Sequence, residues 1–438
     1  MPTALTIAGS DSVGGAGLQA DLKAFEALGV HGCSVVTCVT SQNTKRVSAI
    51  FPVPPSHVLS QLDSVLEDVK LDAIKTGMLY SPEIVEVVAS RLRRGFAPLV
   101  VDPVLSATTG SSLRKDGLEM ALIEMLIPKA TLVTPNLFEA EQLTGIEVRD
   151  ERTAGRAAEE IMEMGARNVL IKGGHLKGQE AADYLFTRNG ITRLATPRTS
   201  VEVHGTGCAL GSLIAGHIAL GSDLLEAVRK SKVMIYKAIV ASETVGKGIR
   251  CANPLAVLRI DAEKVSILER LDAAGQQLER LLDSDLIPEV GSNMGFASIA
   301  ALEPTEVAAF DGRFVRVGQR ARRIGCVKFG ASKHVARIVL AVGCHDPRIR
   351  CALNIKYSDN NLEACRRAKL STSTFDRARE PKGVSSMTWG VHKAIQRHGS
   401  VPDVIFDQGG VGKEPMIRIL GEDPEDVLGK LKKIISKR

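Results

Sequence analysis

The stretch Thr6–Val30, TIAGSDSVGGAGLQADLKAFEALGV, holds an apolar run, a cluster of glycines and then an amphipathic run. This order predicts a strand, a glycine-rich turn and a helix, the unit that builds α/β folds. The alternation continues to about residue 255 and predicts a mostly parallel sheet with helices on both faces. The predicted strands are Ala4–Ala8, Ser34–Thr40, Ala73–Thr76, Leu99–Asp102, Thr131–Thr134 and Asn168–Lys172. The predicted helices are Leu18–Leu28, Val58–Val69, Glu83–Arg93, Gly117–Leu126 and Thr153–Met164. An Asn-Gly turn within residues 182–193 predicts a hairpin after the parallel part.

The glycines of the opening stretch have two interpretations. Gly15, Gly17 and Ala20 fit a dinucleotide-binding fingerprint, which also requires an acidic residue at the end of the next strand. That strand ends in CVTSQNT, and no Walker-type Gly-Lys-Ser/Thr occurs in the chain. Two alternatives stay open. The segment is a plain strand-to-helix turn, or it belongs to a substrate pocket lined by Gly9, Asp21 and Gln42.

Length predicts more than one domain, because 438 residues exceed one ordinary hydrophobic core. Residues 259–286 are a charged amphipathic stretch followed by Pro288, and a pattern richer in arginine and glycine begins after it. We therefore expect an N-terminal domain over residues 1–258, a connector helix over 259–286, and a second, smaller α/β domain over 287–438.

Composition narrows the classes of partner. The net charge is +6, but only 4% of residues are aromatic and one is tryptophan, so we expect no nucleic-acid partner. The basic cluster Arg316–Arg323 would suit phosphorylated small molecules equally well. No apolar run reaches membrane-spanning length and no export signal begins the chain, so we expect no membrane partner. The eight scattered cysteines, with no Cys-x-x-Cys pair, predict the reducing cytoplasm.

Polar residues follow three of the predicted strands. Asp102 ends one strand, Asn136 and Glu139 follow another, and Lys172 ends a third. Each has an ordinary explanation, since an Asn-x-x-Glu can merely cap a helix and a strand-end lysine is often only solvated. Together Asp102, Asn136 and Glu139 predict oxygen ligands for Mg²⁺ on nucleotide phosphates at one edge of the sheet, and Lys172 could contact a phosphate.

The sequence HGTGC at residues 204–208 predicts an anion site. Gly205, Thr206 and Gly207 let backbone N–H groups converge where a helix begins, which suits a transferring phosphoryl group. A thiol at a helix N-terminus has a lowered pKa, so Cys208 could accept a hydroxyl proton or position the nucleophile. The alternative is that Cys208 is a small buried hydrophobe.

Several motifs occur in a diagnostic order: the opening stretch, SQNT, KTGML, DPV, TPNLFEAEQL, KGGH and HGTGC. In this order they resemble the hydroxymethylpyrimidine/phosphomethylpyrimidine kinases of the ribokinase-like superfamily, over about residues 3–245. The resemblance implies a ribokinase-like fold and Cys208 in the place of the aspartate base of sugar kinases. It further implies a pyrimidine pocket made by Gly9, Asp21, Gln42 and Met78. The Mg-ATP site would be made by Asp102, Asn136, Glu139 and Lys172.

One position departs from this family. The family continues the DPV motif into Ala-Lys-Ser-Gly, whereas this chain has Thr108 in place of the lysine. Lys172 or Lys177 would then have to supply any phosphate contact made there.

The C-terminal part contains a further glycine-rich segment, Asp407–Lys413, after an apolar run. Its Gly409 and Gly410 could approach a phosphate that Lys413 neutralises, or the segment is a flexible loop with a solvated lysine. His334 stands at the start of a predicted helix, where a capping or core histidine is the ordinary case.

These C-terminal segments resemble the ThiN-type thiamine-phosphate synthase domain that occurs fused to such kinases, over roughly residues 285–438. The resemblance implies catalysis by Arg313, which would hold the pyrophosphate leaving group, and by His334, which would orient or protonate it. Asp407, Gly409, Gly410 and Lys413 would bind the phosphorylated co-substrate.

Together the resemblances imply a bifunctional enzyme of thiamine biosynthesis that uses ATP and Mg²⁺. Two phosphorylations of hydroxymethylpyrimidine would create the pyrophosphate that thiazole phosphate then displaces, giving thiamine phosphate. One alternative is a kinase whose C-terminal domain only senses thiamine phosphate. Another makes the N-terminal domain a pyridoxal kinase. Since kinases of this kind often pair, we expect a homo-oligomer.

Overall fold

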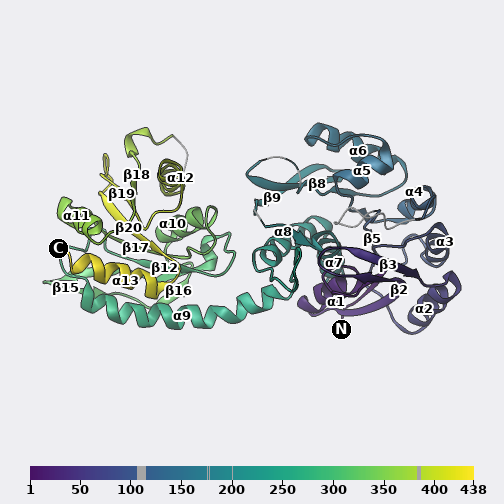
Figure 1. Ribbon diagram of the computed structural model, residues 1–438, viewed down its shortest axis with the longest axis horizontal. Coiled ribbons are helices and arrows are strands. Elements are labelled where there is room, and N and C mark those ends of the chain that lie inside the picture. Colours follow the sequence, from purple (N-terminus) through teal and green to yellow (C-terminus); the bar gives the residue numbers. More distant parts are fainter. Residues whose placement is uncertain (106–114, 175, 177, 200, 382–385) are drawn as a thin grey trace. The chain divides into compact units, whose positions relative to one another are not determined.

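The computed structural model describes residues 1–105, 115–174, 176, 178–199, 201–381 and 386–438, and Figure 1 shows its course. Thr108 and Lys177 lie outside the described residues. The chain divides into two compact units, Met1–Leu258 and Arg259–Arg438.

Within the described residues, nine strands of the first unit form one sheet in the order β3-β2-β1-β4-β5-β6-β7-β8-β9. Strands β2, β1, β4, β5, β6 and β7 run parallel, and β3, β8 and β9 add antiparallel edges. Their bounds are β1 (Thr3–Asp11), β2 (His31–Gln42), β3 (Val47–Pro52), β4 (Ala73–Thr76), β5 (Leu99–Val101), β6 (Leu132–Val133), β7 (Val169–Ile171), β8 (Glu180–Thr187) and β9 (Gly190–Pro197). A separate ribbon joins β10 (Val203–His204) to β11 (Arg250–Cys251).

Helices cover both faces of this sheet, and each face has its own apolar core. One core packs α2 (Pro55–Asp68), α3 (Pro82–Arg91), α4 (Leu118–Ala121), α5 (Leu137–Thr144) and α6 (Glu151–Glu163). The other packs α1 (Gly17–Ala27), α7 (Thr206–Ala219) and α8 (Leu224–Val240). The predicted α/β class, mostly parallel sheet and hairpin are confirmed.

Two local features differ from the prediction. The edge strand β3 was not predicted, because half of its residues are exposed and it carries no continuous apolar run. The expected helix over 117–126 is α4 for one turn only, and then a π-helical turn, η1 (Leu122–Leu126), and a 3₁₀ turn, η2 (Ile127–Lys129). Pro128 in that last turn cannot donate a helical N–H, which favours the irregular ending.

The second unit is built on another sheet, in the order β16-β13-β12-β17-β20-β19-β18. Among the described residues, its neighbouring strands pair antiparallel except β18 with β19. The strands are β12 (Met294–Ala297), β13 (Val307–Phe310), β16 (Val327–Phe329), β17 (Cys351–Lys356), β18 (Thr372–Thr374), β19 (Val404–Asp407) and β20 (Met416–Gly421). A small hairpin pairs β14 (Phe314–Val317) with β15 (Arg320–Arg323). The 3₁₀ turns are η3 (Pro304–Glu306) and η4 (Arg377–Arg379).

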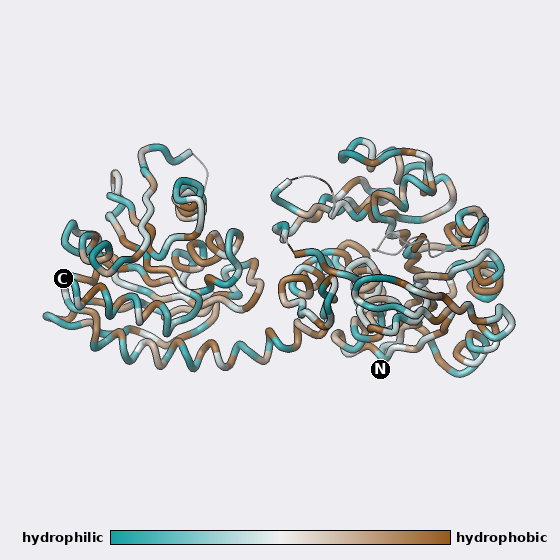
Figure 2. The backbone as a smooth tube through the Cα atoms, in the orientation of Figure 1, coloured by the Kyte–Doolittle hydropathy of each residue, from teal (hydrophilic) through white to brown (hydrophobic). Residues whose placement is uncertain are grey.

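Helices again cover both faces of the second sheet. One core takes α9 (Ala256–Leu281), α11 (Asp359–Arg367) and α13 (Pro424–Ile435), and the other α10 (Lys333–Gly343) and α12 (Ser386–His398). In Figure 2 brown and teal alternate along α9, as an amphipathic helix requires. Its apolar side chains at 267, 271, 274 and 278 belong to the core of the second unit. The stretch expected to connect two domains therefore contributes part of the second unit's core. In the described part of the chain, no helix combines the length and the apolar character needed to cross a membrane.

Arg270 of α9 forms ion pairs with residues at the N-terminus of α13. Its guanidinium bonds to Asp423 at 2.7 Å, forms a second ion pair with Glu425, and lies 5.3 Å from the ring centre of Phe296. Because the side chain is partly exposed, solvent screens these contacts. We expect Arg270→Ala to lower the free energy of unfolding of the second unit by about 1 kcal/mol.

The measurement is denaturant unfolding followed by the fluorescence of Trp389, the chain's single tryptophan, which lies in the second unit. Arg280→Ala is the matched control, because Arg280 is exposed on the same helix. Equal effects of the two variants would show that the ion pairs of Arg270 do not stabilise the unit.

Candidate active sites

Two glycine-rich segments meet at the N-terminus of α7. Gly205 has φ 84°, and a Cβ there would lie 1.7 Å from the carbonyl oxygen of Gly15. Gly17 has φ 56°, and a Cβ there would lie 2.3 Å from the carbonyl oxygen of Gly9. Both positions therefore require glycine. The first N–H groups of α7 point out of the helix at this junction, which is a geometry suited to an anion.

Cys208 stands in the first turn of α7, but its thiol is not activated. Burial raises its pKa to about 11, outweighing the charge of Lys75 and a hydrogen bond from Gly17. The expectation of a lowered pKa is wrong, because the loss of hydration destabilises the thiolate more than the helix N-terminus stabilises it. Cys208 is a neutral thiol at pH 7.

This charge state predicts slow alkylation. Because only the thiolate reacts, labelling of Cys208 by iodoacetamide should be slow at pH 7 and rise about tenfold for each pH unit up to its pKa. Mass spectrometry of the Cys208 peptide from the full chain measures the rate. The exposed Cys326 is the internal control for the reagent. Labelling of Cys208 and Cys326 at equal rates at pH 7 would contradict a half-buried, neutral Cys208 thiol.

Asp21 joins four elements beneath this site. Its carboxylate accepts from Lys75 of β4 at 2.9 and 3.0 Å, from Thr6 of β1 at 2.7 Å and from Ser212 of α7 at 2.7 Å. Asp21 and Lys75 are both fully buried. The expected contact between Asp21 and a pyrimidine is therefore corrected: Asp21 holds Lys75. Burial opposes the charge on Lys75, but Asp21, Cys208 and Asp102 together outweigh burial and leave the pKa of Lys75 raised.

The strand-end residues lie together at the carboxyl edge of the sheet. Lys172 Nζ lies 2.7 Å from Asp102 Oδ1 and 3.7 Å from Glu139 Oε2. Asn136 and Glu139 also cap α5 reciprocally, each accepting the other's backbone N–H at 2.8 Å. Gly207 completes the group, because a Cβ there would lie 3.3 Å from Lys172 Nζ. Asn136 and Glu139 therefore cap α5 and also belong to the cluster with Asp102 and Lys172.

This cluster carries excess negative charge. Burial raises the pKa of Glu139 to about 7, and Lys172 only partly counters it because Asp102 acts in the opposite direction. A further cation would relieve that repulsion. One or two carboxylates are what Mg²⁺ uses when phosphates supply its other ligands. The donor set therefore fits a magnesium ion held on nucleotide phosphates.

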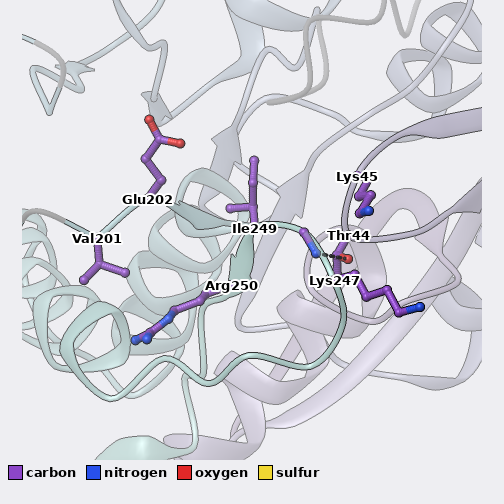
Figure 3. A pocket seen from close by; sticks show the side chains of 8 residues that line it. Thr44, Lys45, Val201, Glu202, Lys247, Ile249 and Arg250 are labelled. Atoms are coloured by element: carbon purple, nitrogen blue, oxygen red, sulfur yellow. Dashed lines mark hydrogen bonds between the residues drawn. The ribbon is translucent and has the colours of Figure 1, made fainter.

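The predicted pyrimidine pocket is partly assembled. A Cβ on Gly9 would lie 2.6 Å from Cys38 Sγ and 3.4 Å from Met78 Sδ, so these residues pack together. Gln42, at the end of β2, has its amide nitrogen 2.8 Å from Nε2 of His204. A different hollow, of about 490 Å³, has Thr44, Glu202, Lys247 and Arg250 among its lining residues and none of the four residues of the predicted pyrimidine pocket. In Figure 3 the side chains of Lys247 and Arg250 extend in opposite directions. These basic side chains do not converge on one point.

In the second unit, Asp407 lies between two arginines. Its carboxylate bonds to Arg377 at 2.5 and 3.1 Å and to Arg418 at 2.7 Å, and it accepts the N–H of Gly409 at 2.9 Å. Asp407 and Arg418 are fully buried. Asp407 was expected to bind a phosphate; it instead orients the guanidinium groups of Arg377 and Arg418.

His334 occupies the first turn of α10 within this positive field. Burial lowers its pKa to about 4, and Arg418, Arg377 and Arg313 act in the same direction. Its Nε2 is buried without a hydrogen-bond partner among the residues that the structure describes. Arg313 has φ 79°, which is uncommon for a residue with a side chain and is often kept at functional sites. A neutral imidazole nitrogen beside arginines is suited to an anionic ligand.

The predicted glycine loop of the second unit is a tight turn. Gly410 and Lys413 exchange two backbone hydrogen bonds of 2.9 Å, and Gly412 between them has φ 70°. Lys413 Nζ lies 2.8 Å from Glu380. The lysine expected to neutralise a phosphate is thus already paired with a carboxylate.

Lys75, Arg377, Arg418 and His204 were not predicted as site residues. Lys75 and Arg418 do have a signal in the sequence, a single cation inside an otherwise apolar strand. Such a cation must find a partner when it is buried. Arg377 and His204 have no comparable signal, because each meets its partner only through the fold.

Comparison with known families agrees with this division of the chain. Residues 11–253 match the family Phosphomethylpyrimidine kinase, and residues 270–433 match Thiamine-phosphate synthase ThiN.

Relatives cover either the whole chain or its first part. A bifunctional thiamine biosynthesis protein ThiDN of Methanocaldococcus jannaschii is 33% identical over 98% of this chain and 97% of its own length. A hydroxymethylpyrimidine/phosphomethylpyrimidine kinase of Rhizobium meliloti is 47% identical over 56% of this chain and 94% of its own length.

Solved structures resemble the first unit. The ADP complex of Bacillus subtilis pyridoxal kinase is 34% identical, with TM-score 0.55, over 59% of this chain and 99% of that one. A Staphylococcus aureus pyridoxal kinase with AMP-PCP and pyridoxal gives the same TM-score, 0.55, and identity, 34%, over 59% of this chain and 96% of that one. The predicted ribokinase-like architecture is confirmed. The chain belongs to the phosphomethylpyrimidine kinase family in its first unit and to the ThiN thiamine-phosphate synthase family in its second, joined over nearly its full length as in ThiDN proteins.

Proposed function

We propose that the chain phosphorylates hydroxymethylpyrimidine and its monophosphate with ATP, and then couples the pyrophosphate to thiazole phosphate. One observation carries the kinase half. The N-terminus of α7 lies between a carboxylate–lysine cluster suited to Mg-ATP and a pocket that contains Gln42 and Met78. The relationship to ThiDN over the full length supports both activities on one chain.

In the kinase site, the hydroxymethyl oxygen attacks the terminal phosphorus of ATP, and the bond between that phosphorus and the ADP oxygen breaks. The hydroxyl proton passes to an oxygen of the transferred phosphoryl group and from there to water. The N–H groups of Gly205, Thr206 and Gly207 stabilise the charge on the transferred group. A thiol with a pKa of about 11 is protonated at pH 7, which favours Cys208 as the group that positions the nucleophile over Cys208 as a base. Lys75 and Asp21 form a buried ion pair below the site.

Asp102 and Glu139 would hold Mg²⁺ on the phosphates, with Lys172 and Asn136 beside them. The ion supplies neutralisation of phosphate charge. When it binds, Glu139 is expected to lose the proton that burial favours.

In the synthase site, the bond between the pyrimidine methylene carbon and the pyrophosphate oxygen breaks, and the thiazole nitrogen bonds to that carbon. Arg313, Arg377 and Arg418 would stabilise the departing pyrophosphate. His334 faces this charge as a neutral imidazole and would donate a hydrogen bond to a leaving oxygen. The glycine turn 409–413 would approach the co-substrate phosphate.

The second candidate is a kinase whose C-terminal unit only binds thiamine phosphate. The buried His334 nitrogen has no hydrogen-bond partner among the described residues and is available to a ligand in either case, so the two candidates differ only in turnover. The test is an assay of the full chain with hydroxymethylpyrimidine, thiazole phosphate and Mg-ATP. Thiamine phosphate is the expected product. Accumulation of the pyrimidine pyrophosphate would instead support the sensor.

All eight cysteines are free thiols, as a reducing compartment would keep them, and the proposal places the reactions in the cytoplasm. It also includes a homo-oligomer, which sedimentation of the full chain would test.

A further inference from the structure

The contact between Gln42 and His204 has a defined polarity. The amide nitrogen of Gln42 lies 2.8 Å from Nε2 of His204. An amide NH₂ only donates, so Nε2 must accept, which requires a neutral imidazole with its proton on Nδ1. Burial lowers the pKa of His204, more strongly than Asp11 raises it, and so supports the neutral ring.

The ring is held firmly in this position. His204 pairs with Cys251 across the β10–β11 ribbon. A Cβ added at Gly15 would lie 3.4 Å from Cδ2 of His204, so the backbone of Gly15 lies close to the ring. On the side of β1, Asp11 Oδ2 lies 3.9 Å from Nε2 and itself accepts the N–H groups of Gly15 and Ala16. Asp11 and Cys251 are thus the titratable groups that face the ring.

The amide oxygen of Gln42 consequently remains an acceptor. The Thr40 hydroxyl lies 3.5 Å from this oxygen but only 2.9 Å from the carbonyl oxygen of Ser10, to which it donates better. We propose that His204 is a positioning residue that fixes the Gln42 amide with its oxygen toward the substrate. The proposal rests on the proposed kinase function.

A fixed acceptor selects the substrate ring. The exocyclic amine of an aminopyrimidine can only donate, so it matches the Gln42 oxygen. A pyridoxine-type ring carries a hydroxyl in place of the amine; the neutral hydroxyl can also donate, but its ionised form would be repelled by an acceptor. His204 would therefore favour amine-bearing rings without touching them.

The test compares His204→Phe and His204→Gln in the full chain, with hydroxymethylpyrimidine and pyridoxine as substrates. Phenylalanine removes the acceptor, whereas glutamine can return an oxygen near the position of Nε2. For His204→Phe we expect KM for hydroxymethylpyrimidine to rise about tenfold, as for one lost orienting hydrogen bond. We expect kcat to change less than about threefold and the preference over pyridoxine to fall by a similar factor of about ten. His204→Gln should retain most of that preference.

A pH series on the wild-type chain tests the same point without a variant. Protonation places a proton on Nε2, the Gln42 amide must turn, and its NH₂ then opposes the substrate amine. KM should therefore rise as pH falls through the lowered pKa of His204, and this rise should be absent in His204→Gln.

Three outcomes are decisive. Equal losses of kcat on both rings in His204→Phe, with unchanged preference, would overturn the proposal and leave His204 a structural residue. A KM without pH dependence in the wild type would also overturn it. If the wild-type chain phosphorylates neither ring, the proposed kinase function fails, which is a separate and distinguishable result.

Discussion

Replacing Asp21 by asparagine should lower the free energy of unfolding of the first unit by about 3–5 kcal/mol, the cost of leaving a buried charge without its partner. Lys75 and Asp21 are both fully buried, and both carboxylate oxygens bond to the ammonium. Asparagine preserves the shape but removes the charge. The hydroxyls of Thr6 and Ser212 bond to different oxygens of Asp21, and because asparagine keeps only one oxygen, one of the two hydroxyls would also lose its acceptor.

The measurement must separate the two units, since a two-unit chain need not unfold in one step. Hydrogen exchange of peptides from β1 and α7 follows the first unit, while Trp389 fluorescence follows the second and should not change. Asp63→Asn is the matched control, because Asp63 pairs with Arg91 in solvent. Such a pair contributes little, and no measurable change is expected.

The result also distinguishes two roles for Asp21. If Asp21 contacted the pyrimidine, Asp21→Asn would fold normally and raise KM. A stable variant with only a raised KM would therefore restore the substrate contact that we have corrected.

The elements of the first unit were predictable because their apolar runs are continuous. Strands β1, β4 and β5 are buried at nearly every residue, and the glycine-rich turn before α1 follows directly from the sequence. The carboxyl edge of a parallel sheet then brings Asp102, Asn136 and Lys172 together with no further assumption. This edge is the part of the site for which sequence reasoning is sufficient.

The roles of the buried acids were not predictable, because their partners are distant in the sequence. Asp21 meets Lys75 and Ser212 across 54 and 191 residues, and Asp407 meets Arg377 across 30. From the sequence alone, an aspartate in a motif could equally bind a substrate or neutralise a buried cation of the protein. Likewise, burial raises the pKa of Cys208 while a helix N-terminus lowers it. Which effect is larger depends on the packed structure.

Replacing His334 by alanine should reduce formation of thiamine phosphate at least about a hundredfold, the usual cost of removing one hydrogen-bond donor from developing negative charge. The reason is the buried Nε2, which faces the arginine cluster and has no other described partner. Kinase turnover in the first unit should be unchanged, so the pyrimidine pyrophosphate should accumulate. His398→Ala is the matched control, because His398 is exposed at the end of α12 and contacts only Ser400 in the described structure.

The pH profile of the wild-type synthase supplies an independent check on the same residue. The profile of kcat/KM reports groups of the free enzyme. Since the pKa of His334 is lowered to about 4, the imidazole stays neutral from pH 8 down to about 5, and kcat/KM should show no inflection from it there. Only as pH approaches 4 does the ring take up a proton, and a change of kcat/KM caused by His334 is expected only there. An inflection near 6.5 that disappears in His334→Ala would show an ordinary, solvated histidine and would contradict the burial on which its role depends.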